Sequence, residues 1–334
     1  MATRPADDAD RPKFSYSVLI ANGLLIVLFI SVVLGFSEEK HILDLLLHIQ
    51  LGWIAFAALL QLATYFFSGG AWEVILRQFT SEVTLGEVAK LGIEKLFLDQ
   101  MIPTLGLGGN LMMVRSLEQR KIRRHEAIAA MLIDSLSYLG SYLILFALAA
   151  VVLWYEVGIS LVIRYLVLAI FVVLLFPISM VFFLMRRTRT SSLPAWMSRF
   201  KPTRALAEAL NEAPKEIFKI QRAWLWSLLC EVAVFVLDIA TLWAVFRALG
   251  VALSAPQALV SFMLASAVST LSVIPGGLGF FEGGAIIVLN SFGISLGTAA
   301  TGVILLRLFT YWLPMIPGYL IFRSEMVARP GAHH

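Results

Sequence analysis

The chain has 334 residues with a net charge of +4, and 59% of its residues are hydrophobic while only 14% are charged. Soluble domains carry about a quarter of charged residues, and several apolar stretches of this chain reach the roughly 20 residues that cross a bilayer. The composition therefore excludes a soluble domain and predicts an all-α, polytopic integral membrane protein. The single cysteine, Cys230, excludes a disulfide framework and a cysteine metal site, and we expect no cofactor.

Six full spans are predicted after a short N-terminal tail at 1–16, which mixes acidic and basic residues and is expected to be disordered. The first apolar stretch is longer than a signal-peptide core and has no small-residue cleavage site, so we expect it to be retained. In chain order, the spans are expected at 17–36, 46–68, 126–154, 162–185, 223–249 and 298–322. They form a single transmembrane domain at 17–323, and the tail at 324–334 ends in two histidines that look like a tag remnant.

Basic residues orient the predicted spans. Clusters of arginine and lysine lie at 115–124 and 186–204. The connections at 37–45 and 155–161 hold a single lysine between them. Loops rich in these residues stay on the cytoplasmic side, so we place both clusters and both chain termini there. The linker at 186–222 has leucine and isoleucine at near-helical spacing and is predicted to be amphipathic and to lie along the cytoplasmic membrane surface.

Two segments of the chain, opening at Thr84 and at Ser254, share the same features. Each begins with the form of a capping box, in which a Glu or Gln follows three residues later and a helix opens. Each helix then meets an Ile-Pro break, at Pro103 and at Pro275. Glycines, which permit unusual backbone angles, follow both breaks. They are Gly106, Gly108 and Gly109 in the first segment and Gly276, Gly277 and Gly279 in the second.

The spacing around the two breaks predicts an internal repeat, at about 46–155 and 223–322. A tryptophan precedes each proline by 31 or 32 residues, and Asp134 or Arg307 follows it by 31 or 32. The first segment begins and ends among the basic clusters, whereas the connections around the second hold no lysine or arginine, so the two enter the membrane from opposite sides. We predict two opposed re-entrant helical hairpins in an inverted repeat, which in transporters marks the binding site. The alternative is that residues 257–274 cross completely and that the breaks are kinks.

Ionisable residues within apolar spans are costly and usually face a cavity or a partner. Glu231 and Asp238 lie seven residues apart, on one helix face with no basic residue between them. They either hold elements together or meet a cation or water. Glu282 follows the second break, and we expect a functional role for it and for Arg307. The partner of Arg307 is open between Asp134, Glu282 and a substrate phosphate.

The first broken helix carries five charged residues, which exclude a lipid-facing position. Lys90 with Glu94 and Lys95 with Asp99 are four residues apart and are predicted to pair within this helix. The sequence has no Gly-Lys-Ser/Thr phosphate loop, so it does not predict an ATP-driven pump. It also has no recognisable Ser-His-Asp or metal-ligand set, so we do not expect an enzyme.

The stretch from Ile274 to Gly283, Ile-Pro-Gly-Gly-Leu-Gly-Phe-Phe-Glu-Gly, resembles the lysylphosphatidylglycerol synthase transmembrane family, also called flippase-like membrane proteins. The stretch at 102–110 followed by Arg115, and the stretch at 307–314, look like other recurring parts of this family. The resemblance implies a protein of the bacterial inner membrane that moves lipids between leaflets. Two-part relatives carry a soluble domain that transfers lysine from tRNA to phosphatidylglycerol. This chain ends a few residues after its last span, so we do not expect that synthase activity.

The favoured function is a lipid transporter of the flippase or scramblase type, with a polar groove at the two hairpin breaks. The forked donors of arginine suit a lipid phosphate, and the carboxylates would meet amino or hydroxyl groups or carry protons. The residues expected to bind or move the substrate are Asp99, Pro103, Gly106, Gly108, Gly109, Arg115, Asp134, Glu231, Asp238, Pro275, Gly276, Gly277, Gly279, Glu282 and Arg307.

The expected partners are membrane lipids, as an anionic or amino-modified phospholipid or a glycolipid, and no nucleic acid. A homodimer and a separate lipid-modifying enzyme are further candidates. Two other functions stay open from the sequence. One is a secondary transporter of a small soluble solute, and the other is a non-catalytic scaffold for a lipid-modifying enzyme.

Overall fold

The computed structural model describes residues 45, 47–78, 84–101, 113–118, 120–155, 161–187, 210, 212, 221–270, 272 and 274–328. Within these residues every regular element is a helix, which confirms the predicted all-α class. Several predictions fall outside the described residues. They are the N-terminal tail, the span at 17–36, the first break with Pro103, Gly106, Gly108 and Gly109, most of the linker at 186–222, and the last residues of the C-terminal tail.

Four elements of the described part are long and apolar enough to cross a membrane. They are α3 (Leu51–Leu76), α6 (Arg124–Tyr155), α10 (Gln221–Ala248) and a continuous rod of α13 (Leu296–Arg307), the π turn η3 (Leu308–Trp312) and α14 (Leu313–Ala328). A further helix, α7 (Leu161–Arg187), matches the span predicted at 162–185. The spans predicted from 46–68 onward are therefore present, with α3 beginning and ending later than expected. The chain is a multi-pass membrane protein.

Both predicted capping boxes are confirmed. The backbone N–H of Thr84 donates to the Glu87 carboxylate at 2.8 Å where α4 (Leu85–Met101) begins. The backbone N–H of Ser254 donates to the side-chain carbonyl of Gln257 at 3.0 Å where α11 (Ala255–Thr270) begins. These bonds satisfy N–H groups that a helix start would otherwise leave without an acceptor.

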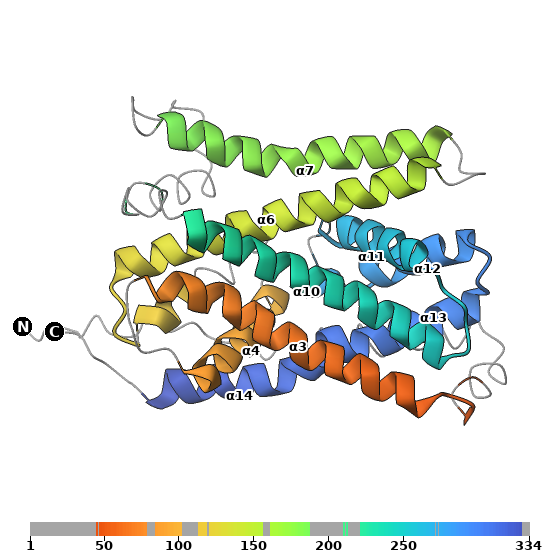
Figure 1. The fold of residues 1–334 in the computed structure, drawn as a ribbon, viewed down its shortest axis with the longest axis horizontal. Coiled ribbons are helices and arrows are strands. Elements are labelled where there is room, and N and C mark those ends of the chain that lie inside the picture. The colour runs from red at the N-terminus through yellow and green to blue at the C-terminus, as the bar shows by residue number, and fades with distance from the viewer. Residues whose placement is uncertain are drawn as a thin grey trace, which may run out of the picture.

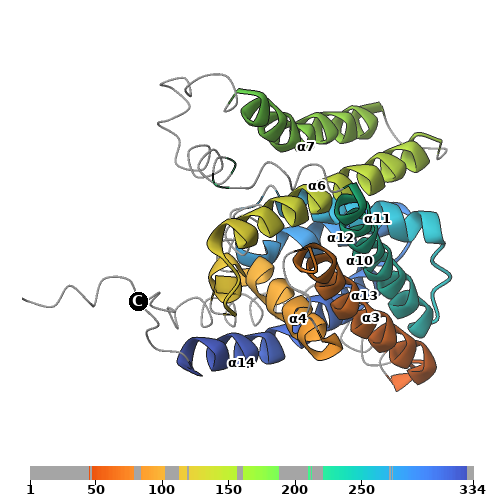
Figure 2. The same ribbon diagram turned by 60° about the vertical axis from the view of Figure 1, so that its left-hand side comes forward.

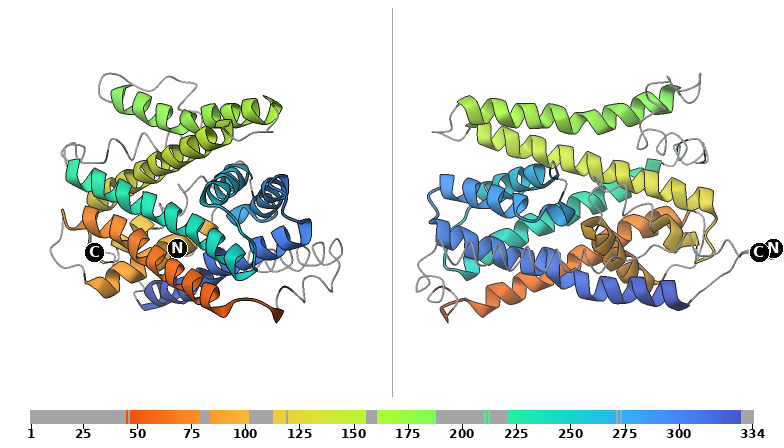
Figure 3. Two further views of the ribbon diagram at one scale, coloured as in Figure 1. Left: turned by 45° about the vertical axis from the view of Figure 1, so that its right-hand side comes forward. Right: turned by 180° about the vertical axis from the view of Figure 1, so that it is seen from behind.

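The second predicted hairpin is formed by α11 and α12 (Phe280–Ser291), which lie side by side (Figure 3). The rings of Phe262 and Phe281 pack edge to face across the two arms, with 5.5 Å between their centroids. At 1.5 Å per residue the 16 residues of α11 span about 24 Å and the 12 residues of α12 about 18 Å. Both are shorter than the hydrocarbon layer of about 30 Å. The chain therefore reverses at the break, as a re-entrant hairpin requires, and does not continue as a kinked span.

The helices α3 and α10 run antiparallel and form the centre of the bundle (Figure 1). The backbone N–H of Gln50, before α3, bonds to the carbonyl of Ala248 at the end of α10, at 2.9 Å. Twenty residues along α3, Gly70 lies beside the sulfur of Cys230. This antiparallel pairing of the first helix of each proposed repeat is what an inverted repeat requires, and the repeat itself stays a prediction.

The helix α4 packs closely on α3 because two glycines face each other's backbone. A Cβ on Gly69 would lie 1.8 Å from the carbonyl oxygen of Val88, and one on Gly92 would lie 2.0 Å from that of Tyr65. Small residues permit such close approach between helices inside a membrane. The contact fixes α4, with its charged residues, inside the bundle and away from lipid.

The outermost of the described helices is α7, which packs against α6 (Figure 2). Its buried residues Val167 and Leu174 join the core of α6, α10 and the second hairpin. The side chains of Leu168, Val172 and Phe176 are exposed and apolar, as expected for a helix that faces lipid.

Candidate functional site

The second break is a tight turn that only glycine can build. After Ile274 the chain forms a short 3-10 turn, η2 (Pro275–Gly277), in which Gly276 and Gly277 have φ of 62° and 60°. Gly279, just before α12, has φ of 84°. These angles lie in the left-handed region that side chains disfavour. A Cβ on Gly277 would also lie 1.6 Å from the hydroxyl oxygen of Ser269.

An ion pair from α13 holds this turn. The Nε of Arg307 donates to Glu282 Oε1 at 2.5 Å, and one terminal nitrogen of Arg307 donates to the carbonyl of Gly276 at 2.6 Å. The other oxygen of Glu282 accepts the backbone N–H of Gly279 at 2.6 Å. Arg307 and Glu282 are both buried. Of the three partners that the sequence left open for Arg307, the structure selects Glu282.

Aromatic rings surround the Arg307 guanidinium and leave part of it open. Its central carbon lies 4.5 Å from the centre of the Phe281 ring and 5.0 Å from that of Tyr311. Guanidinium has five N–H groups, and the printed bonds use Nε and one terminal nitrogen. The remaining N–H groups have no acceptor among the described residues. They are therefore available to an anion in the cavity that Arg307 lines.

The π turn η3 follows Arg307 directly and meets the end of α4. The side-chain amide of Gln100 donates to the carbonyl of Thr310 at 2.9 Å. A π turn shifts the backbone bonding by one residue and is often found at functional sites. This bond joins the first broken helix to the rod that carries Arg307.

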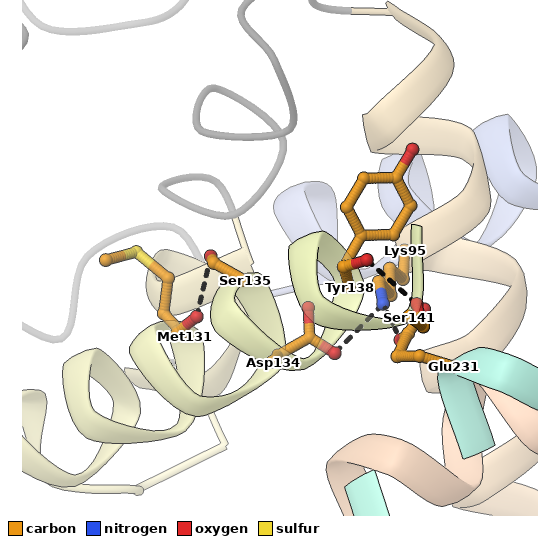
Figure 4. A network of polar contacts seen from close by, with 7 residues as sticks. All are labelled: Lys95, Met131, Asp134, Ser135, Tyr138, Ser141 and Glu231. Atoms are coloured by element: carbon orange, nitrogen blue, oxygen red, sulfur yellow. Dashed lines mark hydrogen bonds and ion pairs between the residues drawn. The ribbon is translucent and has the colours of Figure 1, made fainter. Parts of the chain in front are cut away.

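A second buried network ties α4 to two spans (Figure 4). The ammonium of Lys95 donates to Asp134 of α6 at 2.9 Å and to Glu231 of α10 at 2.5 Å. All three side chains are almost fully buried. The second oxygen of Asp134 has no hydrogen-bond donor among the described residues. One positive charge thus faces two carboxylates, and Lys95 is the cation that Glu231 required.

The ion pairs predicted within α4 are wrong. Lys95 bonds to Asp134 and Glu231 and not to Asp99, and Glu94 forms its ion pair with Arg120 at 2.9 Å. Residues four apart on a helix can reach each other, but a pair along one helix remains exposed on one side. Here the charges face neighbouring helices, because burial favours partners that enclose the charge.

A cavity of about 270 Å³ lies where the second break meets α3, α4, α6 and α10. Its charged lining residues, within the described part, are Asp99, Asp238 and Arg307. The side-chain amide of Gln61 donates to Asp238 at 2.8 Å. No described residue bonds directly to the Asp99 carboxylate. The cavity therefore offers both cationic and anionic groups inside an apolar helical bundle.

The predicted site residues fall into three groups. Gly276, Gly277, Asp99, Asp238 and Arg307 line the cavity. Of the others, Glu282, Gly279 and Pro275 build the turn, and Asp134 and Glu231 belong to the Lys95 network. Arg115 is exposed and is not among the described lining residues. The glycines and proline of the first break lie outside the described residues.

Sequence reasoning missed several uncharged polar residues of the cavity. They are Gln61, Thr64, Gln100, Tyr138, Ser266, Ser269, Thr270 and Thr310. One signal could have found part of this set. Residues 266, 269 and 270 lie at helical spacing and place three hydroxyl groups on one face of an otherwise apolar helix.

The comparison with protein families agrees with the break motif. The family model described as the lysylphosphatidylglycerol synthase TM region matches residues 16–318. The chain belongs to this family. A similar protein of Methanocaldococcus jannaschii, named UPF0104 membrane protein MJ1595, is 21% identical over 328 residues, which cover 92% of this chain and 96% of that protein. The family resemblance seen in the Pro275–Gly283 stretch is thus confirmed across nearly the whole chain.

Proposed function

We propose that the chain is a lipid transporter of the flippase or scramblase type, which moves a phospholipid or glycolipid headgroup between leaflets. The observation that carries this proposal is the cavity at the second break, which places Arg307, Asp99 and Asp238 within a bundle whose outer surface is apolar. Charged groups inside a membrane are costly and usually mark a substrate or ion pathway. Membership of a family described by a lipid synthase's membrane region supports a lipid as substrate.

The headgroup would occupy the cavity while its acyl chains stay in the hydrocarbon layer. The unused N–H groups of Arg307 would bind the phosphate, since guanidinium matches two phosphate oxygens. Asp99 and Asp238 would accept hydrogen bonds from amino or hydroxyl groups of the headgroup. Leu174 of the outer helix α7 lines the same cavity, so the opening to lipid would lie between α7 and the hairpin.

Movement of the α11–α12 hairpin would exchange the Arg307–Glu282 pair for the substrate phosphate. The pair joins α12 to the end of α13 and is the bond nearest to the turn. A second hairpin, at the first break, would complete the pathway from the opposite side, as inverted repeats do in transporters. We place the protein in a bacterial inner membrane with both termini cytoplasmic, on the distribution of basic residues. We expect transport and no enzymatic activity.

The test is the movement of fluorescent lipids across reconstituted vesicles. Phosphatidylglycerol, phosphatidylethanolamine and a glycolipid, each labelled, are followed with a reductant that bleaches only the outer leaflet. We expect at least one lipid to move faster than in empty vesicles. Asp238→Asn, which keeps the acceptor for Gln61, should slow this movement at least tenfold. The matched control, Glu118→Gln outside the cavity, should not change it.

Lipid movement equal to that of empty vesicles for all three lipids would refute the proposal. Uptake of a soluble solute in the same vesicles, lost in Asp238→Asn, would favour the secondary-transporter alternative instead. A scaffold function predicts that Asp238→Asn leaves every transport rate unchanged. The same vesicles thus distinguish the three functions.

A further inference from the structure

A second hollow lies outside the cavity, between α6 and α7. It is a crevice of about 240 Å³, lined mainly by apolar side chains. Those that shape it are Ala147, Ala150 and Trp154 of α6 and Arg164, Leu168 and Phe171 of α7. Arg164 is the only charged side chain among the described residues that line this crevice.

Arg164 has no anionic partner among the described residues. Its guanidinium carbon lies 5.3 Å from the centre of the Trp154 ring. Its Nε is buried and donates no hydrogen bond to a described residue. A buried, charged N–H without an acceptor is costly, and a nearby ring compensates only part of the lost hydration. The crevice therefore presents an unsatisfied cation to whatever enters it.

The stability of α7 does not explain this arginine. The helix begins at Leu161, so Arg164 lies in its first turn. The N-terminal end of a helix carries partial positive charge, which disfavours a cation and attracts an anion. Both the arginine and the exposed backbone N–H groups of this turn favour a negatively charged group at the same place.

The depth of the crevice fits one phospholipid. Trp154 is one residue from the end of α6, and Trp and Arg at span ends mark the membrane–water interface. From Trp154 to Ala147 is seven residues, about 10 Å along the helix toward the hydrocarbon layer. The two alanines open a slot there, opposite Leu168 and Phe171. A charged end at the interface above an apolar slot is the shape of a lipid phosphate and one acyl chain.

We propose that the crevice between α6 and α7 binds one anionic phospholipid. Its phosphate contacts Arg164, and one acyl chain lies between Ala150 and Phe171. This site is separate from the cavity and does not depend on transport. It stands beside the cavity, because Leu174, three residues after Phe171, lines that cavity.

The binding test uses the full chain in detergent with phosphatidylglycerol as the probe. Binding is followed by the rise in unfolding midpoint with lipid concentration and by the bound lipid seen in native mass spectrometry. We expect Arg164→Gln and Ala150→Trp, which removes the cation or fills the slot, each to weaken binding at least tenfold. Arg323→Gln, on the exposed end of α14, is the matched control and should bind as the wild type does. Diacylglycerol, which has the chains without the phosphate, should not compete.

Unchanged binding of phosphatidylglycerol in both Arg164→Gln and Ala150→Trp would overturn the proposal. A second measurement avoids variants that fail to fold. Phosphatidylglycerol with a photoreactive acyl chain should label α6 and α7 of the wild-type protein between residues 147 and 171. Labelling confined to other helices would equally overturn it. Loss of lipid movement without loss of this labelling would refute the transport proposal and leave the site intact.

Discussion

The Lys95 network makes a quantitative prediction, because one ammonium neutralises two buried carboxylates. Lys95→Met removes the cation and fills a similar volume. Asp134 and Glu231 then lose the donor at 2.9 and 2.5 Å and remain within the bundle. Breaking a buried pair by removing one partner costs about 3–5 kcal/mol. At roughly 2–4 °C per kcal/mol for a domain of 150–250 residues, the unfolding midpoint should fall by on the order of 10 °C.

The two carboxylates should respond differently from the lysine. Glu231→Gln leaves one ammonium facing one carboxylate, so the site becomes neutral. Its cost should stay below about 2 kcal/mol, the range for a lost hydrogen bond to a charged group. The triple variant Lys95→Met, Asp134→Asn, Glu231→Gln removes every charge and should regain most of the stability lost in Lys95→Met.

The assay is thermal unfolding of the detergent-solubilised protein, followed by its tryptophan fluorescence. Lys90→Met is the matched control, since Lys90 is an exposed lysine on the same helix. It should shift the midpoint by less than about 2 °C, as surface substitutions do. A Lys95→Met midpoint equal to that of Lys90→Met, or a triple variant no more stable than Lys95→Met, would refute the reasoning from charge balance.

Three further predictions concern the second break and the helix start. Gly277→Ala should lower the unfolding free energy by more than about 3 kcal/mol, because a hydroxyl group lies in the way and the backbone angle alone costs on the order of 1–3 kcal/mol. Gly279→Ala has open space and should cost only that strain, so equal midpoints for the two variants would contradict the geometry. Glu282→Gln keeps an acceptor for the turn but loses the charge that pairs with the guanidinium; lipid movement in vesicles should fall at least tenfold, and an unchanged rate would exclude its role. The hydrogen bonds from Thr84 lower the pKa of the Glu87 carboxyl at the exposed start of α4, so this cap is present above the ordinary pKa of glutamate and is lost as pH falls through the lowered value. Amide exchange in the first turn of α4 should therefore quicken on acidification, and Glu87→Gln should remove that dependence.

The spans and the second hairpin could be predicted because they follow from local properties of the chain. Apolar stretches near 20 residues identified α3, α6, α10 and the α13–α14 rod, and capping boxes identified the starts of α4 and α11. Proline and glycine located the break at Pro275, since these residues act on their own backbone.

The partners of the buried charges could not be predicted in this way. Lys95 meets Asp134 and Glu231, residues 39 and 136 positions away, only because α4 packs between α6 and α10. Spacing along one helix suggested Asp99 instead, which shows that i,i+4 reasoning fails when a helix is enclosed on several sides. Gln61 was missed for a related reason. A lone amide in an apolar span forms no motif, and its function appears only when Asp238 lies opposite.

The extra residue of the π turn gives the rod a stored rotation. An α-helix turns by about 100° per residue, so removing or moving the one-residue insertion would rotate everything before it, Arg307 included, by about that angle relative to α14. The guanidinium would then leave the cavity without any change in helix length. The bond from Gln100 to the carbonyl of Thr310 pins the insertion in place. A single amide on the first broken helix therefore sets the direction in which the arginine of the second one points.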